Sequence, residues 1–370
     1  MKRSKIRTVK LSGTPYDMGY SHGQAYRDDI IRYAKERVSI VCEGTWSGGT
    51  MARADVLALA ESCMPAHRAY APDLVAEMDG MAAATGLTMG ELVIVSGFTD
   101  FVDTVYAATH PDKVAAREPA GISRLPVDDC TAFIVPDGVA ENSAGFFGQT
   151  WDMHDTATEF VILLELEPDE GPNGLVFTTT GCLGQIGMNE AGIAVGINNL
   201  MGADGQVGVT WPFVVRKVLQ QDNLEDALNC ITEANLSGAH NYLLFDSTGQ
   251  GYNIEAMSTA HHITPLHAEP IVHTNHCLAE NTLAVAQPRP PSLQKSTEAR
   301  LVRGQSLLSQ QPVTVDSLMA LTRDPEAICV RAKPPFHVES CGAAIMRPKT
   351  GDMWAVWGLP DENEYEHFKV

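Results

Sequence analysis

The chain has 370 residues, of which 44% are hydrophobic and 19% charged, enough to build a sizeable core in two domains or one large one. Asp and Glu number 46 against 26 Lys and Arg, and the formal net charge of -20 argues against nucleic acid or an anionic membrane surface as a main partner. No apolar run reaches the length of about 18 residues that a transmembrane helix needs, and the basic N-terminus lacks the apolar stretch of a secretory signal. The 8 cysteines are scattered without a C-x-x-C pair, which favours reduced thiols in a cytoplasmic protein over a disulfide framework or a zinc site.

The first third of the chain has mostly helical patterns. A short strand is expected at residues 5–12. Thr14 is a residue type that often caps a helix, and Pro15 suits the first turn. The helix that they open is expected to run to about Cys42. Apolar residues at helical spacing predict helices over 53–69 and 73–85, and a capping box at Thr88 opens another that ends near Tyr106. Residues 108–127 lack periodicity and predict an exposed, mobile segment.

From Cys130 onward the pattern changes to strands, interrupted by helices. Strands are expected at 131–135, 146–150, 160–166, 175–180, 185–188, 193–198, 242–246, 251–256, 271–275, 343–347 and 353–357. Helices are expected at 212–221, 224–234, 296–309 and 315–322. Strands followed by helices and then strands again predict an α+β fold of stacked sheets with helices outside.

The stretch from 128 to 155 organises the candidate chemistry. The strands expected at 131–135 and 146–150 flank a polar turn and should form an antiparallel hairpin. Cys130 enters the first strand and Asp152 follows the second, so the thiol and the carboxylate should meet at the open end. A thiol beside a carboxylate is a plausible nucleophile site. The alternative interpretation of Cys130 is a small buried hydrophobic residue, the commonest role of a free cysteine.

Four blocks resemble a known family. They are Asp-Cys-Thr at 129–131 with Gly-Gln-Thr-Trp-Asp at 148–152, the glycine-rich stretch 13–23, the stretch 187–198, and His-Thr-Asn-His at 273–276. In this order they resemble the acyl-coenzyme A:6-aminopenicillanic acid (isopenicillin N) acyltransferases, which are cysteine N-terminal nucleophile (Ntn) hydrolases. The resemblance implies a four-layer αββα sandwich and self-cleavage between Asp129 and Cys130. Residues 1–129 would be a mainly helical propeptide or small subunit that remains a partner, and 130–370 the catalytic subunit.

The resemblance also implies site roles. Cys130 would be the nucleophile, activated by its own α-amine, whose ordinary pKa of about 7.7–8.0 suits a proton acceptor. Asp152 would orient that amine, and Asn275 would donate to the oxyanion; the alternatives are a surface acid and a turn cap. Asn198, Ser340 and His154 are candidates for contact with substrate.

Further expectations concern ligands and alternatives. His273 and His276 have a metal-like spacing, but on a strand they would point to opposite faces, and no metal site is predicted. No cofactor is expected beyond a possible coenzyme A thioester as acyl donor, and the substrate would be a small amide or acyl thioester. The family's arginine near the penultimate strand is missing from residues 339–345, which disfavours penicillin-type substrates. Rival functions are a dedicated hydrolase of small N-acyl or β-alanyl amides without coenzyme A and a non-catalytic binding protein. The oligomeric state is left open.

Overall fold

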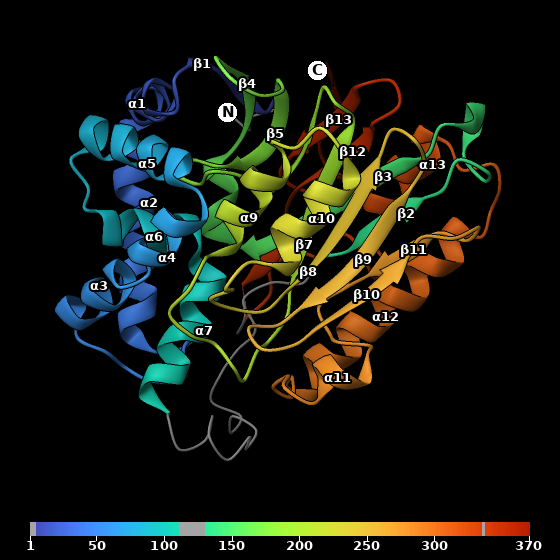
Figure 1. Cartoon of the computed structure of the whole chain (residues 1–370). Helices are drawn as coiled ribbons and strands as arrows, with labels where there is room; N and C mark the ends of the chain where they lie inside the picture. The colour runs from blue at the N-terminus through green and yellow to red at the C-terminus, as the bar shows by residue number, and fades with distance from the viewer. Residues whose placement is uncertain (1–4, 111–129, 335–336) are drawn as a thin grey trace.

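A computed structural model describes residues 5–110, 130–334 and 337–370. Its strands form two sheets (Figure 1). The eight-stranded sheet has the order β1 (Arg7–Gly13), β4 (Val161–Pro168), β5 (Gly174–Thr179), β6 (Ile186–Asn189), β7 (Ile193–Asn199), β8 (His240–Asp246), β9 (Gly251–Ala256) and β10 (His261–Pro265). The six-stranded sheet has the order β11 (Ile271–His273), β2 (Ala132–Val135), β3 (Phe146–His154), β12 (Val338–Arg347), β13 (Asp352–Trp357) and β14 (Glu366–Lys369).

The helices fall into two groups along the chain. Ahead of Cys130 lie α1 (Pro15–Ala25), α2 (Arg27–Glu43), α3 (Arg53–Glu61), α4 (Met64–Tyr70), α5 (Pro72–Thr85), α6 (Met89–Ser96) and α7 (Phe98–Thr109). After it lie α9 (Trp211–Val218), α10 (Leu224–Thr232), α11 (Glu280–Leu283), α12 (Pro291–Leu308) and α13 (Val315–Thr322). The capping box at Thr88 is formed as predicted, with the Thr88 hydroxyl accepting from the Glu91 backbone N–H at 3.2 Å.

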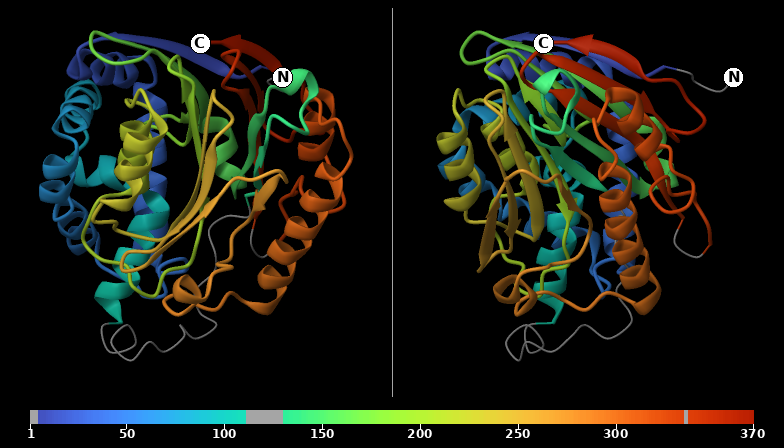
Figure 2. Two further views of the ribbon diagram at one scale, coloured as in Figure 1. Left: turned by 45° about the vertical axis from the view of Figure 1, so that its right-hand side comes forward. Right: turned by 90° about the vertical axis from the view of Figure 1, so that its right-hand side faces the viewer.

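The two sheets stack face to face between layers of helix. Helices α9 and α10 pack on the eight-stranded sheet, and α12 and α13 pack on the six-stranded sheet. Figure 2 shows the strands between the orange helix α12 on one side and the yellow and blue helices on the other. The predicted α+β class and the four-layer αββα sandwich implied by the Ntn resemblance are therefore confirmed.

The two sheets are joined by a buried polar side chain. Gln149 on β3 accepts a hydrogen bond from the Ile197 N–H on β7 at 2.9 Å and donates one to the Ile197 carbonyl. Close approach requires glycine at this point, because a Cβ on Gly196 would lie 2.5 Å from the Phe147 ring. The arrangement fixes β3, which carries Asp152, against β7, which carries Asn198.

The N-terminal segment is built into this sandwich. Strand β1 pairs in parallel with β4, with Arg7 opposite Ile162 and Gly13 opposite Pro168. On α5, the buried carboxylate of Glu77 accepts two hydrogen bonds, of 2.9 and 2.8 Å, from Arg216 on α9. The segment ahead of Cys130 thus contributes both a strand and a buried ion pair to the rest of the fold.

Several boundaries differ from the sequence predictions. The helix expected from Thr14 to Cys42 is broken at Tyr26, and the one expected from Thr88 to Tyr106 is broken at Gly97. A Cβ at Gly97 would lie 2.7 Å from the Thr210 side chain, so a distant contact determines this break. Strands β10 and β14 were not predicted, because these edge strands are largely exposed and lack apolar alternation.

Among the described residues, no single helix is long and apolar enough to cross a membrane; only α5 and α6 together meet the length and composition, across a bend of 111°. All eight cysteines are free thiols.

Candidate active site

Cys130 lies immediately before β2 and is completely buried. The hairpin register pairs Ala132 with Gln149 and Val135 with Phe146. Cys130, two residues ahead of Ala132, therefore lies beside the C-terminal part of β3. There the Asp152 backbone N–H donates to Cys130 Sγ at 3.4 Å, and Sγ lies 3.7 Å from the Asp152 carbonyl oxygen. The sequence predicts that the thiol and the carboxylate of these residues meet; the contacts observed join the thiol to the backbone of Asp152.

Two side chains hold the carbonyl group of Cys130. Arg300 Nη1 donates to this oxygen at 2.6 Å, and Asn198 Nδ2 donates to it at 3.3 Å. Arg300 Nη1 also lies 3.2 Å from Thr131 Oγ1. Both Arg300 and Asn198 are fully buried. The backbone on the C-terminal side of the candidate nucleophile is therefore held in position by a cation and an amide.

Arg300 was not identified from the sequence. It lies on the buried face of α12, whose other buried residues are Leu293, Thr297, Gly304 and Leu308. An arginine at helical spacing among buried positions indicates a buried charge with a dedicated partner, and this signal was available in the sequence. Its Nη2 donates to Asn275 Oδ1 at 3.0 Å, so one guanidinium joins Cys130 to Asn275.

Asn275 follows β11 and is fully buried. Its Nδ2 donates to the Asn199 carbonyl oxygen at 3.1 Å, and its backbone N–H donates to Thr297 Oγ1 at 2.9 Å. Arg289 Nη1 donates to its backbone carbonyl at 2.8 Å. Every polar group of Asn275 is thus held by a neighbour, which fixes the amide that was predicted to stabilise an oxyanion.

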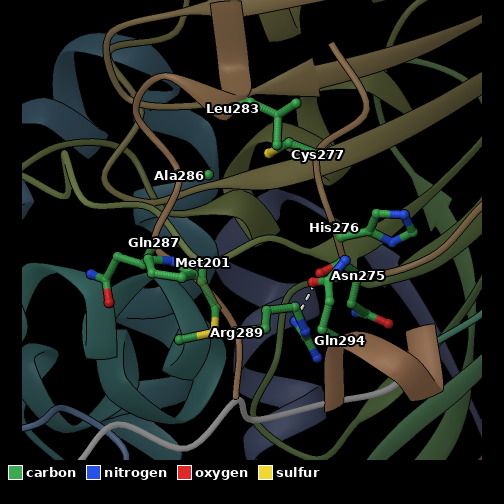
Figure 3. A pocket seen from close by; sticks show the side chains of 10 residues that line it. Met201, Asn275, His276, Cys277, Leu283, Ala286, Gln287, Arg289 and Gln294 are labelled. Atoms are coloured by element: carbon green, nitrogen blue, oxygen red, sulfur yellow. Dashed lines mark hydrogen bonds between the residues drawn. The ribbon is translucent and has the colours of Figure 1, made fainter. Parts of the chain in front are cut away.

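A cavity of about 390 Å³ adjoins Asn275. Figure 3 shows Leu283 and Cys277 at one end, with Arg289 and Gln294 beside Asn275 at the other; the dashed line marks the Arg289–Asn275 hydrogen bond. The remaining lining residues are Met201, His276, Ala286, Gln287 and Pro288. The cavity is mixed in character, with an apolar end and a cationic side chain next to the amide.

Two predicted substrate contacts lie elsewhere. Ser340 is opposite Asp152 in the β12–β3 ladder, but its buried hydroxyl accepts from the Val330 N–H at 2.9 Å. His154 is held by Arg37, whose Nη1 lies 2.8 Å from His154 Nδ1, and by ring contact with Trp46. Neither Ser340 nor His154 lines the cavity beside Asn275, and neither do Cys130, Asp152 and Asn198. Burial and the neighbouring guanidinium hold the pKa of His154 well below its usual value.

The two histidines of the 273–276 block have separate partners. His273 Nε2 lies 3.1 Å from Glu255 Oε1, while His276 Nδ1 lies 3.2 Å from Thr274 Oγ1 and 3.1 Å from Thr297 Oγ1. The expectation that both lie on one strand is wrong, because β11 ends at His273. Within residues 5–110, 130–334 and 337–370, no group of three or more His, Cys, Asp or Glu side chains could hold a metal ion.

Two further predictions concern the surroundings of Cys130. Asp129, the residue before the predicted cleavage point, lies outside the described residues. The family's missing arginine was sought only near residues 339–345, whereas the structure brings Arg289 and Arg300 to Asn275 from the chain leading into α12 and from α12 itself.

Comparison with known proteins gives related findings. An "Acyl-coenzyme A:6-aminopenicillanic-acid-acyltransferase 40 kDa form" of Emericella nidulans is 24% identical over 275 residues, which are 73% of this chain and 69% of that protein. An uncharacterized protein of Archaeoglobus fulgidus is 25% identical over 260 residues, 65% of this chain but only 41% of that protein.

Solved structures similar to this chain include a mutant conjugated bile acid hydrolase from Clostridium perfringens, with 11% identity and a TM-score of 0.43 over 65% of this chain and 97% of that one. Penicillin V acylase from Agrobacterium tumefaciens has 13% identity and a TM-score of 0.41 over 65% of this chain and 86% of that one. The family model described as "Acyl-coenzyme A:6-aminopenicillanic acid acyl-transferase" matches residues 139–362, which contain Asp152, Asn198 and Asn275. Since this match covers more than half of the 370 residues, the chain belongs to the acyl-coenzyme A:6-aminopenicillanic acid acyl-transferase family.

Proposed function

We propose that the protein is a self-cleaving Ntn amidohydrolase or acyltransferase that acts on a small N-acyl amide through an acyl-enzyme at Cys130. The observation that carries the proposal is the single guanidinium of Arg300, which bonds both the Cys130 carbonyl oxygen and Asn275 Oδ1. A candidate nucleophile and a candidate oxyanion donor, far apart in sequence, are thereby held by one side chain, and the oxyanion donor, but not Cys130, lines the cavity.

In the proposed acylation step, the α-amine of a newly N-terminal Cys130 takes the thiol proton. The thiolate sulfur attacks the carbonyl carbon of the substrate, and the negative charge that develops on oxygen is met by the Asn275 amide. When the C–N bond breaks, the protonated α-amine returns its proton to the leaving amine. Asp152 orients and stabilises the ammonium form. The product is a thioester on Cys130, from which water or an acceptor amine removes the acyl group.

The same sulfur would carry out maturation. Cys130 Sγ attacks the carbonyl of the preceding peptide bond, the C–N bond breaks as the C–S bond forms, and the nitrogen becomes the α-amine. Water then hydrolyses the thioester and leaves a carboxylate on the first fragment. The expected products are residues 1–129 and 130–370, about 14 and about 26 kDa when the 40.0 kDa mass is divided in proportion to chain length.

The proposal is tested by intact-mass analysis and N-terminal sequencing of the purified protein, followed by a panel of N-acyl amides and acyl thioesters. Two fragments that begin at residue 1 and at Cys130, with a substrate-dependent mass increase on the larger fragment, are expected. Cys130→Ala should give a folded, uncleaved and inactive chain. Cys63→Ala is the matched control, because Cys63 is also fully buried and burial raises its pKa, yet its thiol contacts the Leu59 carbonyl oxygen in the helical N-terminal segment.

Two results would contradict the proposal. A first residue other than Cys130 in the larger fragment, or full activity of Cys130→Ala, would exclude this nucleophile. A chain that stays at 40.0 kDa and is never acylated would instead favour a binding protein on the same fold.

A further inference from the structure

Helix α7 buries a polar face. Thr99, Asp100, Asp103 and Thr104 are each at most 4% exposed, and their spacing places the two pairs one turn apart on the same side of the helix. Burying two carboxylates and two hydroxyls costs free energy unless each forms hydrogen bonds. The hydrogen-bond partners of this face therefore show which segments α7 holds in place.

The partners come from two segments that follow β7 and precede β8. Thr104 Oγ1 lies 2.8 Å from Ser237 Oγ and 3.1 Å from each of two carbonyl oxygens, that of Gln206 and that of Asp100 in its own helix. Asp103 Oδ2 accepts from the backbone N–H groups of Gly202 and Ala239, at 3.4 and 3.3 Å.

The neighbouring turn of α7 is held in the same way. Asp100 Oδ2 accepts from the Trp211 backbone N–H at 2.7 Å, and Asp100 Oδ1 lies 2.9 Å from His240 Nδ1. Glycines allow the two segments to reach the helix directly: a Cβ on Gly205 would lie 2.7 Å from the Asp103 backbone, and one on Gly238 would lie 2.5 Å from Asp100. The contact leaves no room for a side chain between α7 and the loop.

The same loop forms one wall of the cavity beside Asn275. Met201 lines the cavity, and its carbonyl oxygen accepts from the Gln287 backbone N–H at 2.7 Å, while Gln287 Nε2 donates to the Gly202 carbonyl at 2.7 Å. Two residues before Met201, the Asn199 carbonyl accepts from Asn275 Nδ2. A continuous set of hydrogen bonds and chain connections therefore runs from α7 through residues 199–206 to both the cavity wall and the candidate oxyanion donor.

We propose that α7 helps to shape the active site. Thr104 is a positioning residue: it holds the loop 199–206, which carries the Met201 wall of the cavity. The inference rests on the proposed function for the identity of the site. Because α7 lies ahead of Cys130, cleavage before Cys130 would leave a helix of one fragment setting the substrate cavity of the other.

The test compares Thr104→Val, which removes the hydroxyl at nearly constant volume, with Thr104→Ser, which keeps it. The matched control is Thr85→Val. Thr85 is also buried in the N-terminal segment, but its hydroxyl donates to the Met81 carbonyl and accepts from the Leu87 N–H, both of which belong to that segment. Thr104→Val should raise KM by at least about threefold, with kcat within about twofold, while Thr104→Ser and Thr85→Val stay near wild type. Thermal unfolding should show similar losses for the two valine variants.

Hydrogen exchange supplies a readout that does not depend on turnover. Peptides covering residues 199–206 and 283–289 should exchange faster in Thr104→Val but not in Thr85→Val. Unchanged exchange and unchanged KM in Thr104→Val would overturn the inference. Failure of the proposed function has a different signature, since wild-type protein would then show no turnover and no acylation of Cys130, while the exchange experiment would still decide whether α7 positions the loop.

Discussion

Arg300 Nη1 donates a 2.6 Å hydrogen bond to the carbonyl oxygen of Cys130, and Nη2 of the same side chain reaches Asn275. A planar guanidinium presents its donors in a fixed fork, so the separation of the two acceptors is set by the geometry of one rigid group. The distance between Cys130 and Asn275 therefore cannot increase without breaking one of the two buried hydrogen bonds of Arg300.

Replacement of this arginine should lower catalysis more than stability. We expect Arg300→Lys to keep the positive charge but to lose one of the two contacts, and to reduce kcat by about 100-fold, the scale of losing one preorganised donor. Arg303→Lys is the control on the same helix, because Arg303 is partly exposed and pairs with Asp324. Steady-state kinetics on cleaved protein make the comparison; a kcat within a factor of about two of wild type in Arg300→Lys would remove the arginine from the site.

Asp152→Asn should fold and yet lose most turnover. A neutral amide cannot favour the protonated α-amine during acyl transfer, whereas the backbone contacts of Asp152 with Cys130 are retained. Asp155→Asn serves as control, since this acid follows β3 and is partly exposed. The measurement is kcat of the correctly cleaved variant, and an unchanged value would show that the carboxylate takes no part.

Removal of one partner of the buried ion pair between Glu77 and Arg216 should strongly destabilise the fold. Arg216→Met leaves a carboxylate in a site whose burial already raises the pKa of Glu77, and we expect a loss of about 3–5 kcal/mol in the free energy of unfolding. Lys10→Gln is the control, because the exposed Lys10–Glu167 pair also joins the N-terminal segment to β4 and should contribute about 0–1 kcal/mol. Urea denaturation of both variants tests this, and equal losses would contradict it.

Stability should fall as the pH drops below about 6.5. Burial lowers the pKa of His22 and of His67 to about 3 each, so both stay neutral in the folded state while the unfolded chain binds their protons near pH 6.5. The unfolded state therefore binds more protons between about pH 6.5 and 3, and the free energy of unfolding rises with pH in this window.

Replacing one of these histidines measures its contribution to the pH dependence of the free energy of unfolding. His67→Gln keeps an acceptor for the Thr210 N–H, which donates to His67 Nε2 at 3.0 Å, and should reduce the slope by up to about 1.4 kcal/mol per pH unit between pH 5 and 6. Denaturant unfolding at several pH values gives both slopes, and identical slopes for His67→Gln and wild type would contradict the expectation.

Local features of the fold could be predicted where local chemistry decides them. Helix α13 was predicted with its observed bounds, since Thr314 caps it with its side chain and apolar residues recur at helical spacing. The hairpin that joins Cys130 to Asp152 followed from strand composition and a polar turn. The breaks at Tyr26 and Gly97 could not be foreseen, because the second depends on Thr210, more than a hundred positions away in the chain.

The candidate site was also predictable only in part, because several of its contacts join residues that are distant in the chain. Cys130, Asp152, Asn198 and Asn275 were named from motifs, and the structure brings them together through buried contacts. The spacing of α12 marks Arg300 as buried, but no local pattern says which carbonyl oxygen it meets. Ser340 was named because it lies where the family's arginine is missing, and His154 because it follows Asp152; their observed partners are Val330 and Arg37.

The pairing of β1 with β4 has a consequence for making the protein. A gene that begins at Cys130 would encode every predicted catalytic residue, but it would leave β4, a run of buried apolar residues, as an open edge of the larger sheet. An exposed, flat, apolar edge invites pairing with other chains. Such a product is expected to aggregate, and soluble catalytic subunit should be obtained only when both parts of the chain are synthesised together.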